Sequence, residues 1–160
     1  LEVQPQQVTL VPDSVDQLTS NHGWDTKQYA DDLRMWIEAF HDKGIRVSVF
    51  VDPIPEMVEH AALVGADRVE LYTGPYAELY ATHPLQAIEA YRAAALCAKK
   101  VGLGLNAGHD LNLHNLNDLV TAFPWIDEVS IGHALIADAL YLGIEEKIRQ
   151  YKRCLVINEN

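Results

Sequence analysis

Residues 47–72 read VSVFVDPIPEMVEHAALVGADRVELY, which is a β-rich run, a helical stretch and a second β-rich run. Pro53 and Pro55 separate the first run from the helix, and Gly65 follows the helix as a stop signal. Valine is frequent in both runs, which is typical of strands in a sheet that is covered on both faces. The segment therefore predicts two parallel strands joined by a helix.

The same alternation extends in both directions along the chain. Besides 47–51 and 69–72, strands are expected at 8–11, 103–106 and 129–131. Besides the helix after Pro55, helices are expected at about 29–40, 84–100, 116–123, 134–142 and 144–155. The fold class is therefore α/β with five parallel strands, either a complete doubly wound sheet or five-eighths of a (β/α)8 barrel. Both architectures bind ligands at the carboxyl ends of the strands.

Composition restricts the class of protein further. The 160 residues are 49% hydrophobic, which suits a single domain over residues 1–160. Asp and Glu outnumber Lys and Arg by 23 to 12, and this net charge of −11 argues against binding to nucleic acid or anionic lipid. The sequence contains no apolar run of about 18 residues, so no membrane span is predicted. Cys97 and Cys154 are far apart, which indicates reduced thiols in a cytoplasmic protein.

Gly132 and His133 stand where the last expected strand runs into a short helix. A glycine at this junction lets an oxyanion approach the backbone, and the N–H groups of the helix would then hold a phosphate. Barrel enzymes often bind phosphate at a short helix after the eighth strand. The alternative is a glycine that only turns the chain, with His133 capping the helix.

His109 follows the fourth expected strand, between Gly108 and Asp110. An imidazole, whose unperturbed pKa is roughly 6.5, suits proton transfer near neutral pH. The alternative is a loop histidine bonded to a nearby carbonyl. His109 and His114 lack a carboxylate at ligand spacing, so no metal site is expected.

Glu70 lies inside an otherwise apolar strand. Because an unpaired buried carboxylate is costly, its side chain either points into a site or forms a buried ion pair, and both alternatives stay open. The loop 12–25, which contains Thr19, is long for a connection between a strand and a helix. Such a loop is either a mobile lid or a static loop.

These segments together resemble the pyridoxine 5′-phosphate synthase family, barrel enzymes that close the vitamin B6 ring. The resemblance rests on Leu10-Val11-Pro12, Leu18-Thr19 before Gly23 and Asp25, VSVFVD at 47–52, ELYTGPYA at 70–77, NAGHDL at 106–111 and IGHALI at 131–136. It covers essentially the whole chain, in order and with matching spacing. It implies a TIM barrel to which this chain supplies about strands four to eight.

The family joins 1-deoxy-D-xylulose 5-phosphate to 3-amino-2-oxopropyl phosphate, giving pyridoxine 5′-phosphate, inorganic phosphate and water. The resemblance therefore implies a transferase-type, ring-closing enzyme of pyridoxine biosynthesis. It also implies a cytoplasmic homo-octamer without metal or organic cofactor. His109 would be the proton donor and Glu70 an active-site carboxylate. Four further residues would bind the phosphorylated substrates: Thr19, Asp110, Gly132 and His133. Many relatives have glycine at the position of Asp110, so a backbone contact is expected there.

Family members begin with three more strands that carry further catalytic side chains, and no segment of this chain matches them. The chain also begins without Met. We therefore expect it to be part of a longer polypeptide. Two alternatives remain beside the synthase, namely another phosphate-binding barrel enzyme and a non-catalytic fragment that is inactive alone.

Overall fold

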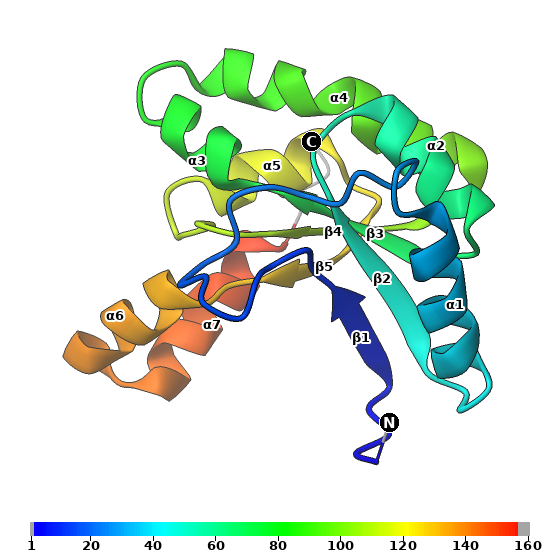
Figure 1. The fold of residues 1–160 in the computed structure, drawn as a ribbon. Coiled ribbons are helices and arrows are strands. Elements are labelled where there is room, and N and C mark those ends of the chain that lie inside the picture. Colours follow the sequence, from blue (N-terminus) through cyan, green and yellow to red (C-terminus); the bar gives the residue numbers. More distant parts are fainter. Residues whose placement is uncertain (1, 157–160) are drawn as a thin grey trace.

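The computed structural model describes residues 2–156, which form a parallel sheet with strand order β1-β2-β3-β4-β5 (Figure 1). The strands are β1 (Gln7–Leu10), β2 (Arg46–Val51), β3 (Arg68–Tyr72), β4 (Gly104–Gly108) and β5 (Ile126–Ser130). The helices are α1 (Ala30–His41), α2 (Pro55–Leu63), α3 (Gly74–Tyr80), α4 (Pro84–Val101), α5 (Leu116–Ala122), α6 (His133–Leu142) and α7 (Ile144–Cys154). The α/β class and the alternation of strands and helices are confirmed.

Two features differ from the sequence-based expectation. The short helix α3 was not predicted, because Gly74 and Pro75 signal the end of a strand but are also tolerated in a first helical turn. Strand β5 begins three residues before the expected 129–131 and ends at Ser130. Its start is set by pairing with β4, in which Leu105 lies opposite Ile126. Sequence periodicity does not contain this pairing information.

The sheet curls so that its two edge strands approach each other across one face. Gln7 Nε2 of β1 donates to Glu128 Oε2 of β5 at 2.8 Å. Arg46 of β2 donates to both residues, at 2.7 Å to Gln7 Oε1 and 2.7 Å to Glu128 Oε1. A sequential strand order with such a curl is that of a barrel, whereas doubly wound sheets reverse their strand order. The fold is therefore part of a (β/α)8 barrel.

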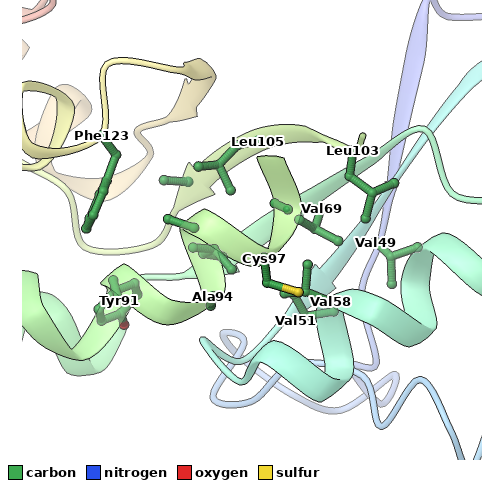
Figure 2. Close-up of a cluster of buried hydrophobic side chains, with 14 of the residues drawn as sticks. Val49, Val51, Val58, Val69, Tyr91, Ala94, Cys97, Leu103, Leu105 and Phe123 are labelled. Atoms are coloured by element: carbon green, nitrogen blue, oxygen red, sulfur yellow. The ribbon is translucent and has the colours of Figure 1, made fainter. Parts of the chain in front are cut away.

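The apolar core fills the space between the convex face of the sheet and its helices. Figure 2 shows Val49, Val69 and Leu105 from three strands together with Val58 of α2 and Cys97 of α4. Each of these side chains is buried. The core fixes the strands from outside, and the carboxyl ends of the strands are left free to carry other chemistry.

Candidate active site

A pocket of about 320 Å³ lies at the carboxyl ends of β4 and β5. Five of the six predicted site residues line it: Thr19, His109, Asp110, Gly132 and His133. Ser130 and Ile131 complete the lining. The chain brings these side chains together because β4 and β5 are neighbours in the sheet and the loop after β1 reaches across to them.

His109 is held at the edge of this pocket by contacts on two sides. Its Nε2 lies 2.9 Å from Thr19 Oγ1, and a hydroxyl at that distance donates or accepts according to the tautomer. The ring of Tyr72 stands perpendicular to the imidazole, with 5.0 Å between ring centroids. His109 Nδ1 lies 3.0 Å from Asp110 Oδ2 but is not aligned for a hydrogen bond with any group of residues 2–156. The imidazole is thus held on two sides, while its second nitrogen makes no hydrogen bond within the described part of the chain.

The backbone of His109 and Asp110 adopts an unusual conformation. Their φ angles are +98° and +55°, in a region that residues with a side chain seldom enter. Such a conformation costs roughly 1–2 kcal/mol per residue, and less for Asp than for most side chains. Side chains elsewhere in the fold must therefore hold this turn in place.

The loop that carries Thr19 is anchored to the end of β2. Trp24 N–H donates to Phe50 O at 2.8 Å, and Gly23 N–H donates to Asp52 Oδ2 at 3.2 Å. A Cβ atom at Gly23 would collide with the backbone of residues 51–52, so only glycine permits this approach. In this structure the loop holds Thr19 over the pocket.

Glu70, the sixth predicted residue, does not line the pocket but lies on the concave face of the sheet. It is 7% exposed, and its Oε2 accepts a hydrogen bond from Thr9 Oγ1 at 3.2 Å. Its other oxygen lies over Gly108, where a Cβ atom would collide with it. No cationic side chain within residues 2–156 pairs with Glu70, so a buried ion pair is not observed among these residues.

Burial raises the pKa of the Glu70 carboxyl above its usual range. Hydrogen bonds from Ser130 and Thr9 oppose this shift, and the negative charge of Glu128 adds to it. The balance favours the neutral, protonated form of Glu70 more strongly than in a solvated carboxyl group. Glu70 is thus equipped to hold a proton close to the site.

Gly132 and His133 lie at the start of α6, and both are exposed. A Cβ atom at Gly132 would meet nothing within 4 Å, so crowding does not require glycine there. No hydrogen bond of the His133 side chain is found among the described residues, so capping by His133 is not observed. A second pocket of about 380 Å³ also touches Asp110, Gly132 and His133. The start of α6 is therefore open to a ligand from two sides.

A polar network on the concave face was not predicted from the sequence. Arg68 Nη1 donates to Asn106 Oδ1 at 2.9 Å and lies 3.3 Å from Asp127 Oδ2, while Asn106 Nδ2 donates to Glu128 Oε2 at 3.2 Å. The signal was present in the sequence, because alternate residues of a strand share one face. The concave polar side chains follow that spacing: Gln7 and Thr9, Arg46 and Ser48, Arg68 and Glu70, Glu128 and Ser130.

Within residues 2–156 no three His, Cys, Asp or Glu side chains gather as a metal site would require. No helix in the same range has the length and apolar composition needed to cross a bilayer.

Comparison with known proteins gives a consistent set of matches. A family model described as pyridoxal phosphate biosynthesis protein PdxJ matches residues 1–157. The chain is 59% identical over 155 residues to pyridoxine 5′-phosphate synthase of Bacteroides thetaiotaomicron and 58% identical to that of Bacteroides fragilis. It is 53% identical over 156 residues to that of Porphyromonas gingivalis. These matches cover 97–98% of the chain, which spans about 65% of the length of the first two relatives.

Proposed function

The chain belongs to the pyridoxal phosphate biosynthesis protein PdxJ family, and from that premise we propose that it acts in pyridoxine 5′-phosphate synthesis. The proposed reaction condenses 1-deoxy-D-xylulose 5-phosphate with 3-amino-2-oxopropyl phosphate. Its products are pyridoxine 5′-phosphate, inorganic phosphate and water. The names of the relatives support synthesis of pyridoxine 5′-phosphate, and an imidazole, a hydroxyl group and a helix start at one pocket support the proposal.

The observation that carries the proposal is the contact between Thr19 and His109 at the pocket edge. In the proposed reaction His109 donates a proton during ring closure, and Thr19 contacts the deoxyxylulose phosphate. His109 Nε2 lies 2.9 Å from the Thr19 hydroxyl. A substrate atom that takes the place of this hydroxyl would therefore lie within reach of a proton from His109. Thr19 is exposed, so a substrate can take its place beside the imidazole.

The phosphate of the aminoketone is assigned to the start of α6. Gly132 leaves backbone N–H groups accessible, and the N-terminus of a ten-residue helix attracts an anion. His133 and the backbone of Asp110 complete this proposed subsite from two sides.

In this proposal Glu70 acts from the concave face of the sheet, outside the lining of the pocket. Its carboxyl group holds a proton more readily than a solvated carboxyl group, and it lies against Gly108, next to His109. Glu70 would therefore assist proton transfer or orient the substrate.

The remaining expectations stay predictions. They are a single domain over residues 1–160, a transferase-type mechanism without metal or organic cofactor, a cytoplasmic location and a homo-octamer. Size measurement in solution tests the last of these directly.

The test mixes the purified chain with both substrates and follows phosphate release together with the ultraviolet absorbance of the new pyridine ring. Because the relatives are longer, a second sample adds the amino-terminal part of the Bacteroides thetaiotaomicron relative, co-expressed with the chain. Both signals, each requiring both substrates, are expected in this second sample, which we call the complemented sample.

Two other outcomes would replace the proposal. Phosphate release from one substrate alone would favour another phosphate-handling barrel enzyme. Binding of inorganic phosphate without turnover in either sample would favour a non-catalytic chain.

A further inference from the structure

Two residues at helix N-cap positions use their side chains to bind a different part of the chain instead of their own helices. Thr73 precedes α3 and Asn115 precedes α5, and both residue types usually accept a hydrogen bond from the second or third N–H of the helix that follows. Neither side chain does so here. Thr73 Oγ1 instead donates to His109 O at 2.5 Å, and Asn115 Nδ2 donates to Asp110 O at 3.2 Å.

Other groups accept hydrogen bonds at or just before each helix start. In α3 the second residue is Pro75, which has no N–H, and the third, Tyr76, donates its N–H to Tyr91 Oη at 3.2 Å. Ahead of α5, Asn112 takes the capping contacts. Its Oδ1 accepts from His114 N–H at 2.9 Å, and its backbone oxygen accepts from Leu116 N–H at 3.1 Å. Thr73 and Asn115 are therefore free to bind elsewhere.

The carbonyls that they bind belong to His109 and Asp110, whose φ angles are both positive. A strained turn persists only where its surroundings determine it strongly. Thr73 is fully buried and Asn115 is 2% exposed, so their hydrogen bonds do not compete with water. Asn112 Nδ2 adds a longer contact to Asp110 O at 3.4 Å.

Both clamping residues are themselves held firmly. Thr73 N–H donates to Gly108 O at 2.9 Å, which ties it to β4 immediately before the turn. Asn115 O accepts from Tyr76 Oη at 2.6 Å, and Asn115 Oδ1 accepts from Asn112 N–H at 2.8 Å. The turn is thus connected through buried groups to α3, α5 and β4.

We propose that Thr73 and Asn115 are positioning residues, which hold the His109–Asp110 turn in its positive-φ conformation and so keep the His109 imidazole at Thr19. The expected effect on turnover rests on the proposed function. The expected effect on the position of the imidazole does not.

The first test follows the His109 ring by NMR of histidine-labelled protein, with His109→Ala to assign its signal. Thr73→Val removes the hydroxyl at nearly constant shape and is expected to move the His109 signal. Thr19→Val made in the parent chain should also move the His109 signal. When Thr19→Val is added to Thr73→Val, the His109 signal should not move further. Thr73→Ser, which restores a hydroxyl, should return the parent spectrum.

The chain offers a matched control in Thr26. This residue is also fully buried, and its Oγ1 donates to the backbone oxygen of Met57 at 2.8 Å, away from the pocket. Thr26→Val should lower the melting temperature about as much as Thr73→Val and leave the His109 signal in place. An unchanged His109 signal in Thr73→Val would overturn the proposal and leave Thr73 with a structural role only.

The second test uses Asn115→Asp, which keeps the acceptor for Asn112 N–H and removes the donor to Asp110 O. In the complemented sample its kcat should fall by roughly ten- to a hundredfold, as expected for a displaced catalytic group, with a smaller change in KM. Asn115→Ala is the second variant, for use if the buried charge of Asn115→Asp prevents folding.

If the parent chain shows no turnover in the complemented sample, that result contradicts the proposed function and not the positioning role. The NMR comparison still tests the positioning role. Parent-like kcat and a parent-like His109 signal in both Asn115 variants would overturn the role of Asn115.

Discussion

The two faces of the sheet carry different chemistry although the same strands form both. On the convex face Val47, Val49 and Val51 are fully buried against helices. On the concave face the alternate positions hold hydrogen-bonded polar groups that are nearly as buried, such as Asn106, 2% exposed, and Glu70, 7% exposed. Burial therefore does not distinguish the two faces, whereas hydrogen bonding does.

This difference has a physical consequence for each face. Apolar side chains on the convex face need only volume and shape, and they tolerate replacement by residues of similar size. Each buried polar group on the concave face needs a particular partner, because an unsatisfied one is costly. The convex face therefore stabilises the fold, and the concave face determines where groups such as Glu70 lie.

The largest effect is expected on the convex face. Leu105→Ala removes a side chain that is 1% exposed and should lower the free energy of unfolding by about 3 kcal/mol. Urea denaturation measures this loss, and titration with inorganic phosphate should show unchanged affinity. A weaker phosphate affinity in the folded variant would show that the two faces are coupled.

His109→Ala should have the opposite pattern to Leu105→Ala, with a loss of activity and little change in stability. Turnover in the complemented sample should fall by roughly a hundredfold or more, as for loss of a general acid, while phosphate affinity and melting temperature change little. His114→Ala serves as the control, because His114 is an exposed histidine in the same loop. Turnover equal to that of the control would remove His109 from its proposed role.

Arg68→Met tests the polar network with a side chain of similar length. The substitution leaves Asn106 Oδ1 and the carboxylate of Asp127 without this donor, and should cost about 1–3 kcal/mol. The Arg68 side chain is 14% exposed, so solvent replaces little of the lost bonding. An unfolding free energy equal to that of the parent would show that the network adds no stability.

Glu70→Gln is expected to have the smallest effect, and one that depends on pH. Because burial raises the pKa of Glu70, the parent chain loses stability as pH rises from below the usual carboxyl range through this raised pKa. The variant cannot ionise, so it should be the more stable protein at neutral pH and should lose this advantage below about pH 4. Thermal unfolding at several pH values measures the difference, and a parent that is more stable at neutral pH would contradict the sign.

Much of the fold could be predicted from local sequence. Gly102 ends α4 with φ +80°, as a helix stop should, and Pro84 lies in its first turn. The grouping of five predicted site residues around one pocket also agrees with the sequence, because parallel strands bring their carboxyl ends to one edge. Helix α3 escaped prediction because seven residues that begin with Gly-Pro carry no periodic signal.

The sequence by itself determined the alternation of strands and helices, the helix ends and the position of His109 after a strand. These features depend on residues close together in the chain, through backbone sterics and hydrophobic spacing. Only the tertiary structure decided the curl of the sheet, the partners of Glu70 and the contact of His109 with Thr19, which is 90 positions away. Such contacts depend on how distant segments pack, and a buried polar side chain takes whichever partner that arrangement brings within hydrogen-bond distance.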